Sequence, residues 1–273
     1  MNSCDRELMQ REQMSLIEVM HSTDAITCFK VSWKTYKEPY LLKRINQSIL
    51  SKDLFEERMK LYHPNIINKY RYWSYGIYHY YLVDYIKDNI ADIVRKFGPL
   101  QEDMFLNFAQ SMLESLNFFH TKKIFFKNLL PTNYLIDKHN RIRMCDIREM
   151  EIVSSYKASN DVFMLGQIFY YMISGVSQDS HDFIPHDQLP DVNAFINNII
   201  FPRKISGEVK DLIRRCLNFT EESTIYDILQ CQAFKHVPPY RKNRNSVSLN
   251  PVATPITINF NMKPITIKCG RMI

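Results

Sequence analysis

The chain is poor in glycine. Only six of its 273 residues are glycine, and none of them precedes Gly76. Glycine is the residue that lets a backbone approach a bound phosphate closely, because it has no Cβ. The N-terminal part therefore has no glycine-rich loop of the kind that holds nucleotide phosphates.

Long apolar runs and grouped cysteines are also missing. No run of 18 apolar residues occurs, so we expect no membrane span. The N-terminus, MNSCDRELMQREQMS, is charged and has no apolar signal core, so we expect no secretion. The six cysteines are scattered without paired ligand spacing. They indicate reduced thiols, a cytoplasmic location with the nucleus as the alternative, and no metal site.

Acidic residues are absent after Ile228. Seven lysines and arginines lie in that stretch, more than the net charge of +6 for the whole chain. A basic tail can bind nucleic acid or an acidic membrane surface. We favour the simpler interpretation of a solvated tail, because charge runs are usually solvated.

The central stretch His120–Ile147, HTKKIFFKNLLPTNYLIDKHNRIRMCDI, has the most informative pattern. It predicts a helix end, a short loop, a strand at Asn133–Ile136, a turn at Lys138–Asn140 and a strand at Arg141–Cys145. Upstream, the one-sided apolar stripe of Gln101–Phe119 predicts a helix. The apolar fraction of 45% is ample for a core.

This stretch resembles the catalytic core of a protein kinase, whose pattern is H-R-D-L-x-x-x-N followed by D-F-G. Phe126-Lys127-Asn128-Leu129 falls on H-R-D-L. Asn133 falls on the metal-binding Asn, and Asp146-Ile147-Arg148 falls on D-F-G. The catalytic Asp is replaced by Asn128 and the following Lys by Leu130, so the resemblance implies a kinase fold without its chemistry.

The N-terminal motifs of that family are similarly altered. Aligned with the glycine-rich loop, His21, Thr23 and Ile26 stand in place of its three glycines. The predicted strand PYLLKRI retains the lysine of the kinase V-A-I-K motif as Lys43. The small alanine of that motif, which forms the roof of the adenine pocket in the family, is replaced by Leu41. Helix SKDLFEERMKLY, which we expect Ser51 to cap, should supply the carboxylate that pairs with Lys43. Glu56 and Glu57 are both candidates.

Later positions complete the resemblance. The run beginning at Asp161, DVFMLG, is similar to the kinase D-V-W-S-L-G helix start. Only fourteen residues separate Asp146 from Asp161, and they contain no A-P-E triplet. Phe126 and Ile147 occupy two positions of the apolar column that links the lobes in active kinases. We expect Lys43, Asn133 and Asp146 to be vestigial nucleotide and magnesium positions.

The resemblance implies an α+β, two-lobed fold with a small β-rich N-lobe and a larger helical C-lobe. We expect a lead-in at 1–14, an N-lobe at 15–86, a C-lobe with a truncated activation segment at 87–237, and a basic tail at 238–273. The terminal helices resemble Ser/Thr kinases such as the polo-like group. In its missing glycine-rich loop and its short activation segment, the chain resembles mixed lineage kinase domain-like pseudokinases, including compact viral versions.

The expected function is therefore that of a pseudokinase, not an enzyme, with no cofactor. It would act as a scaffold, decoy or allosteric partner of an active protein kinase or another signalling protein. In the viral alternative it would interfere with host cell-death or innate signalling. The second alternative is an enzyme with weak ATP and magnesium binding, acting as a residual kinase or ATPase.

Overall fold

The structure is a computed structural model of the chain. It describes residues 1–34, 36–126, 129–145, 150–151, 158–175, 192–197, 199–202, 204–220, 222–235 and 237. Contacts divide the chain into two units, Met1–Val237 and Pro238–Ile273. The basic tail at 238–273 lies outside the described residues.

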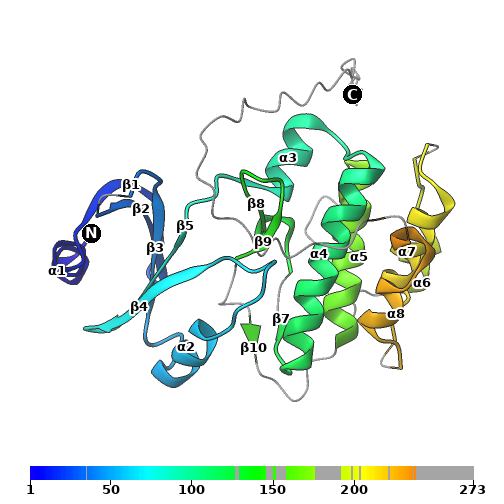
Figure 1. The fold of residues 1–273 in the computed structure, drawn as a ribbon. Coiled ribbons are helices and arrows are strands. Elements are labelled where there is room, and N and C mark those ends of the chain that lie inside the picture. Colours follow the sequence, from blue (N-terminus) through cyan, green and yellow to red (C-terminus); the bar gives the residue numbers. More distant parts are fainter. Residues whose placement is uncertain are drawn as a thin grey trace, which may run out of the picture. The chain divides into compact units, whose positions relative to one another are not determined.

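An antiparallel five-stranded sheet forms the N-terminal part (Figure 1). The strands follow the order β1-β2-β3-β5-β4. Alternating apolar and aromatic residues predict these strands, and the β4–β5 hairpin turns at Gly76, whose φ of 58° suits glycine. The bounds are β1 Met14–Ser22, β2 Ile26–Trp33, β3 Tyr40–Asn46, β4 Lys69–Tyr75 and β5 Tyr78–Asp84.

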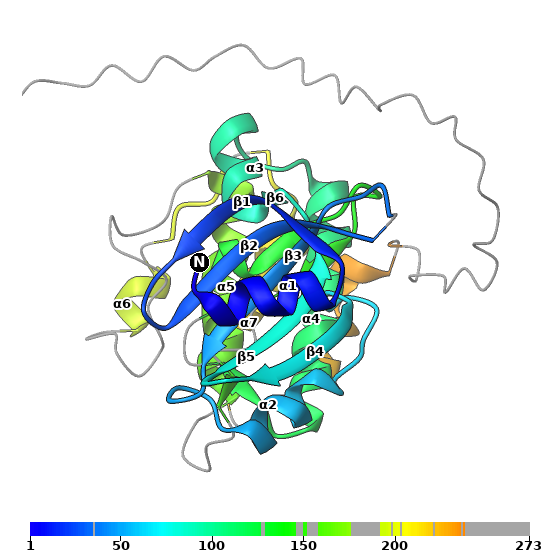
Figure 2. The same cartoon turned by 90° about the vertical axis from the view of Figure 1, so that its left-hand side faces the viewer.

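Helix α1 (Ser3–Arg11) lies across one face of this sheet (Figure 2). Its Leu8 and Met9 join a separate apolar core with sheet residues such as Phe29 and Leu42. From the sequence, residues 1–14 are expected only as a lead-in, and this packing is not predicted. The sheet therefore has an apolar core on this face that is separate from the core of the helical part.

A buried carboxylate fixes α1 to the sheet. Asp5 is fully buried and accepts hydrogen bonds from Arg44 Nη1 at 2.7 Å and from the Tyr80 hydroxyl at 2.8 Å. Arg44 also donates to the Thr27 hydroxyl at 2.7 Å. Because the buried charge is paired and fully hydrogen-bonded, the helix has one defined position on the sheet.

Helix α2 (Lys52–Met59) begins at the predicted cap, where Ser51 Oγ accepts from the Leu54 amide. It ends shortly before Pro64, as expected for a chain that approaches a proline. Phe55 is fully buried and stacks on His79 with ring centroids 4.4 Å apart. This helix therefore packs against the sheet through an aromatic contact.

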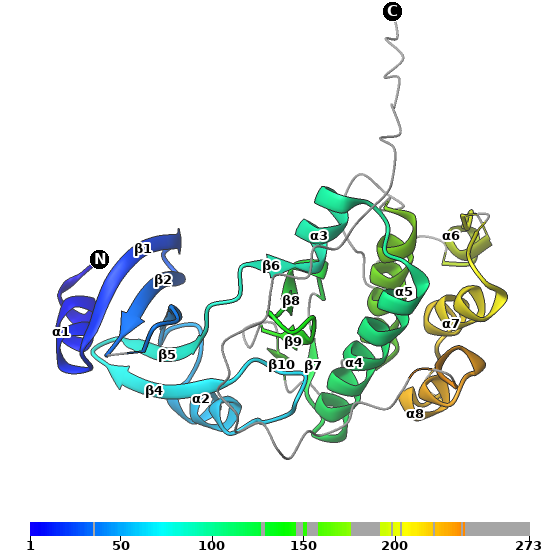
Figure 3. The same cartoon turned by 45° about the horizontal axis from the view of Figure 1, so that its top comes forward.

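The C-terminal part is helical, with α4 and α5 running side by side (Figures 1 and 3). The predicted apolar stripe of α4 is buried along its whole length. The helices are α3 Ile90–Phe97, α4 Glu102–Thr121, α5 Ala158–Ser174, α6 Val192–Asn197, α7 Gly207–Leu217 and α8 Ile225–Leu229. The short strands are β6 Asp88–Asn89, β7 Phe125–Phe126, β8 Tyr134–Ile136, β9 Ile142–Met144 and β10 Met150–Glu151.

Some bounds differ from those that the sequence predicts. Helix α3 is not predicted, and α5 begins at Ala158, three residues before Asp161. Helix α8 begins at Ile225, because Thr224 and Asp227 form a capping box that starts it there. Within the described ranges, none of the helices combines the length and hydrophobicity that a membrane span needs.

Gly166 sets the distance between α5 and α7. A Cβ at this position would lie 2.9 Å from Leu217 Cδ2 and 3.0 Å from Cys216 Cβ. Both neighbours are buried, so the added carbon has no free space to occupy. Glycine is therefore required here for close helix packing and not for its backbone freedom.

We predict that Gly166→Ala lowers the free energy of unfolding by about 1–3 kcal/mol, as overpacked cores do. The matched control is Gly207→Ala at the start of α7, where nothing lies within 4 Å of the added Cβ. That change should leave stability equal or slightly higher, because alanine favours helix. Urea unfolding measures both. Equal stability of the two variants would contradict the packing argument.

Candidate functional site

The turn between β1 and β2 stands where a kinase has its phosphate-binding loop. It is closed by its own hydrogen bonds. The Thr23 amide donates to the Ile26 carbonyl at 2.7 Å, and the Ile26 amide donates to the Thr23 hydroxyl at 3.0 Å. His21 lies exposed in β1, while Ile26 is buried at the start of β2. Both amides at the two ends of this turn are therefore occupied within the turn.

Lys43 lies half-buried in β3, with its Nζ 5.9 Å from the centroid of the Tyr81 ring. Of the two candidate glutamates, Glu56 is half-buried and forms an ion pair with Lys52 at 3.9 Å within α2. Glu57 is exposed. The pair between Lys43 and either glutamate stays a prediction.

A second contact connects β2 with the segment after β5. Lys30 Nζ lies 4.3 Å from the centroid of the Tyr85 ring, within the range of a cation–π interaction. In the register of the sheet, Lys30 is opposite Leu41, the residue at the roof position. A lysine and a leucine therefore lie next to each other at the strands where the family binds a purine.

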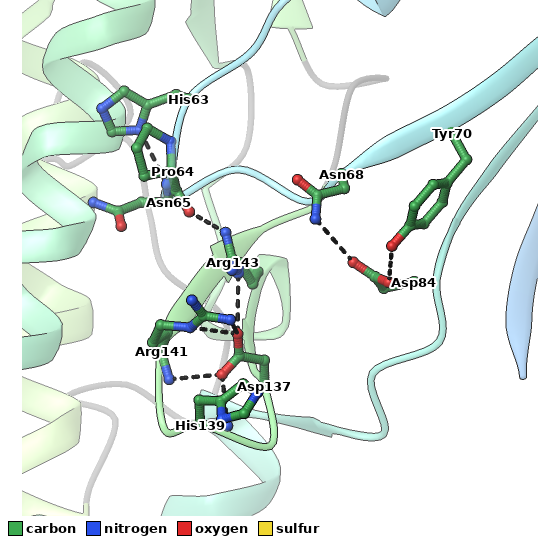
Figure 4. Close-up of polar contacts among 10 residues, drawn as sticks. All are labelled: His63, Pro64, Asn65, Asn68, Tyr70, Asp84, Asp137, His139, Arg141 and Arg143. Atoms are coloured by element: carbon green, nitrogen blue, oxygen red, sulfur yellow. Dashed lines mark hydrogen bonds and ion pairs between the residues drawn. The ribbon is translucent and has the colours of Figure 1, made fainter. Parts of the chain in front are cut away.

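The residue before Tyr85 is tied to β4. Asp84 accepts from the Tyr70 hydroxyl at 2.6 Å and from Asn68 Nδ2 at 3.4 Å (Figure 4). Burial and the hydrogen bond to Asp84 raise the pKa of Tyr70. The Tyr70 ring also packs edge-on against Tyr40, 5.2 Å between centroids. This strand end is therefore held by side chains of its neighbours.

Phe126 and Asp161 connect the catalytic-loop region to α5. Phe126 is buried, and its ring packs edge-on on Phe119 at 5.1 Å. Its amide donates to both carboxylate oxygens of Asp161, at 3.1 and 3.2 Å. Asp161 is fully buried and also lies 2.8 Å from His120 Nε2. Burial raises the pKa of Asp161, and its hydrogen bonds with His120 and Phe126 offset part of that rise.

Asn133 caps the turn that follows. Its side-chain Oδ1 accepts from the backbone amide of Leu130 at 2.7 Å, and its backbone amide donates to the Leu130 carbonyl at 2.9 Å. Its carbonyl accepts from the Cys145 amide at 3.0 Å. The side-chain oxygen that the kinase pattern assigns to a metal is thus bound to backbone, and Leu130 carries no charge for a phosphate.

Three predicted site residues, Asn128, Asp146 and Ile147, lie outside the described residues. Their roles stay predictions. In the part of the chain that is described, no group of three His, Cys, Asp or Glu side chains is arranged to hold a metal ion.

The connection between α2 and β4 contacts the C-terminal part at several points. The Met144 amide of β9 donates to the Asn65 carbonyl at 2.8 Å, and the Ile67 amide donates to the Met144 carbonyl at 2.9 Å. Asn65 Nδ2 donates to the Ser111 carbonyl and to Glu114 of α4, both at 3.0 Å. We call these contacts of Asn65, Ile67 and Met144 the Asn65 clamp.

An arginine of β9 reinforces the clamp. Arg143 is buried, donates to the Pro64 carbonyl, and donates through Nε to Asp137 at 3.2 Å (Figure 4). Burial raises the pKa of Asp137, but hydrogen bonds from Arg141 outweigh this and hold it below the usual value. Asp137 therefore stays charged and keeps Arg143 oriented toward the Asn65 clamp.

Sequence reasoning missed the clamp. The pattern His63-Pro64-Asn65-Ile66 indicates the end of a helix before a proline, but it does not indicate the partners of Asn65. The signal was an asparagine directly after a proline, followed by apolar residues that predict a buried loop. An amide in a buried loop needs partners, which here come from Ser111 and Glu114.

Comparison with known proteins agrees with this geometry. The sequence profile of the protein kinase domain matches residues 17–148. The fold is that of a protein kinase domain, with a β-sheet N-terminal part and a helical part. The comparisons support a place for the chain in the protein kinase superfamily.

Similar curated proteins are distant. The serine/threonine-protein kinase RUNKEL of Arabidopsis thaliana is 24% identical over 49% of this chain and 10% of its own length. The carbon catabolite-derepressing protein kinase of Candida glabrata is 24% identical over 71% of this chain and 37% of its own length. Its counterpart in Candida albicans is 24% identical over 75% and 39%. The chain spans well under half the length of these relatives.

We predict that Asn65→Ala lowers the free energy of unfolding by about 1–3 kcal/mol, because it removes a buried donor from the Ser111 carbonyl and from Glu114, which keeps the hydrogen bond from Gln110. The same change should raise the pKa of Glu114, since burial already raises it and the Asn65 hydrogen bond lowers it. Urea unfolding measures the stability.

The matched control is Asn107→Ala. Asn107 is an exposed residue of α4 whose Nδ2 donates to the Asp103 carbonyl at 2.8 Å. We expect a change within about 0.5 kcal/mol there, as for most surface substitutions. Equal effects of the two substitutions would show that Asn65 holds nothing together.

Proposed function

We propose that the chain is a catalytically inactive pseudokinase that acts as a binding module. In this role it is a scaffold, decoy or allosteric partner of an active protein kinase. The kinase fold and the similarity to Ser/Thr kinases support a role in kinase signalling. The altered side chains of the site support the loss of chemistry.

The closed β1–β2 turn is the observation that carries this proposal. A kinase covers the phosphates of ATP with glycine-rich backbone. Here the Thr23 and Ile26 amides are satisfied within a tight turn, at 2.7 and 3.0 Å. A phosphate would have to break these bonds and displace side chains at each position where a glycine is expected.

The catalytic loop supports the same proposal. The Asp of a kinase loop accepts the proton of the substrate hydroxyl, and Asn128 has no carboxylate to do so. Such a base contributes roughly 10²–10⁴-fold to the rate. The Asn133 oxygen is already bound to the Leu130 amide. The catalytic base, the metal-binding oxygen and the backbone that would hold phosphate are thus each lost or already occupied.

The alternative is a residual kinase or ATPase that binds ATP weakly. The retention of Lys43, Asn133 and Asp146 favours it. The half-buried position of Lys43 on β3 is compatible with a nucleotide contact. This alternative needs the β1–β2 turn to open, which the pseudokinase proposal does not.

The finer identity is also a proposal. Polo-like kinases and mixed lineage kinase domain-like pseudokinases remain the two candidate groups. A viral member of the second group would bind a component of host cell-death or innate signalling, in the cytoplasm or the nucleus. The basic tail offers a further surface for acidic partners, and the solvated tail remains our preferred interpretation.

We predict that ATP with magnesium leaves the thermal stability of the chain unchanged and that no phosphate is incorporated from labelled ATP. A ligand at about 100 times its Kd would stabilise the fold by about 2.7 kcal/mol, which a thermal-shift assay resolves readily. Lys43→Ala should therefore behave like the parent chain.

The two readouts separate the alternatives. A stabilisation by ATP that Lys43→Ala abolishes would favour the weak nucleotide binder. Phosphate incorporation that Asp146→Ala abolishes would overturn the pseudokinase proposal itself. The binding role is tested by adding the purified chain to active kinases that it captures from cells and measuring their rates.

A further inference from the structure

A pocket of about 370 Å³ lies where the end of α2 meets the end of α4. Its volume is at the small end of the range for ligand pockets, which is about 300–1,000 Å³. The α2 side of the pocket leads directly into His63-Pro64-Asn65, the segment that carries the Asn65 clamp. Neither Lys43 nor Asn133 lines it, so the pocket is separate from the nucleotide position.

The inner part of this pocket is apolar. It is lined by Leu61, Phe118 and Ile124, of which Ile124 is buried and the other two are half-buried. The Phe118 ring packs on His63 and on Phe119, with ring centroids 5.1 and 5.5 Å apart. These contacts hold the ring in place, so the pocket offers a fixed apolar surface to an incoming side chain.

Lysines surround the mouth of the pocket. Lys60 lines it from the end of α2 and Lys122 lines it from the end of α4, and both are exposed. Lys122 Nζ lies 5.1 Å from the centroid of the Phe118 ring, so a cation and the apolar surface are adjacent. Glu57 is the one carboxylate among the lining residues. With the exposed Lys123 next to Lys122, positive charge exceeds negative charge at this mouth.

A further cation lies behind the pocket wall. Lys69 Nζ donates to the Leu61 carbonyl at 2.9 Å, and burial lowers the pKa of this lysine to about 8. The amine is therefore mostly charged at neutral pH. Buried charges are normally paired, yet among the described residues no carboxylate pairs with Lys69 or with the three lysines at the mouth. The pocket thus combines an apolar interior with a net positive charge.

We propose that this pocket binds an acidic peptide segment of a partner protein. One apolar side chain of the segment occupies the interior, and flanking carboxylates face Lys60 and Lys122. Tyr62 lines the pocket with 75% of its surface exposed. This residue supports a protein as the occupant, because protein interfaces are enriched in tyrosine.

The basic tail of the chain does not fit this site. From Ile228 onward the chain has seven lysines and arginines and no acidic residue, so the pocket repels it. The charge of the pocket therefore selects another molecule. The pocket is available whether or not the chain transfers phosphate, so the inference does not rest on the proposed pseudokinase function.

Fluorescence polarisation with the full chain and a labelled pentapeptide tests the proposal. The probe has one phenylalanine between two pairs of glutamates. We expect saturable binding with a Kd of about 1 mM or tighter, weakened by salt because exposed charges are screened. A peptide with alanine in place of phenylalanine, or with lysines in place of the glutamates, should bind at least about tenfold more weakly.

Two double variants assign the binding to the pocket. Lys60→Glu with Lys122→Glu should weaken binding of the acidic peptide at least about tenfold and should strengthen binding of the lysine peptide. The matched control, Lys37→Glu with Lys87→Glu, makes the same change in net charge at exposed lysines outside the pocket and should leave binding unchanged. All four positions are exposed, so thermal unfolding of both variants should match that of the parent chain.

Several results would overturn the proposal. These are the absence of saturable binding, equal binding of the alanine peptide, and equal loss of binding in the two double variants. Sedimentation velocity tests a second copy of the chain as the occupant. A dimer of the parent chain that is lost on changing Lys60 and Lys122 would assign the pocket to self-association and would also overturn the proposal.

Discussion

The Asn65 clamp is the contact on which the arrangement around the site depends. Two backbone hydrogen bonds, of 2.8 and 2.9 Å, connect Asn65 and Ile67 with Met144, and the Asn65 amide extends the contact to α4. Arg143 adds a charged donor from the same strand. These bonds lie between buried protein groups, so they hold the β-rich part against the helical part without a nucleotide.

Around the candidate site, the described residues pair their buried polar groups with one another. Asp161 still binds the Phe126 amide, and Asn133 still caps its turn. By contrast, the β1–β2 turn satisfies its own amides, and Leu130 replaces a charged residue. The constraint that remains is structural: buried polar groups must be paired, whether or not any substrate is present.

The sequence predicts the elements well and their packing less well. The helix cap at Ser51 and the turn at Gly76 follow from local chemistry, which is set by neighbouring residues. The resemblance to the kinase motifs identified Lys43, Phe126 and Asp161 as site residues, and all three lie among the residues that the structure describes. The packing of α1, the partners of Asn65 and the pocket between α2 and α4 depend on residues far apart in the chain. No local pattern reports them.

Hydrogen exchange at the amides of Ile67 and Met144 tests most directly whether the Asn65 clamp holds without a nucleotide. Both amides donate across the clamp and both residues are buried. We predict strong protection in the absence of nucleotide, unchanged after ATP and magnesium are added. Rapid exchange in the free chain, or protection that appears only with ATP, would contradict the account.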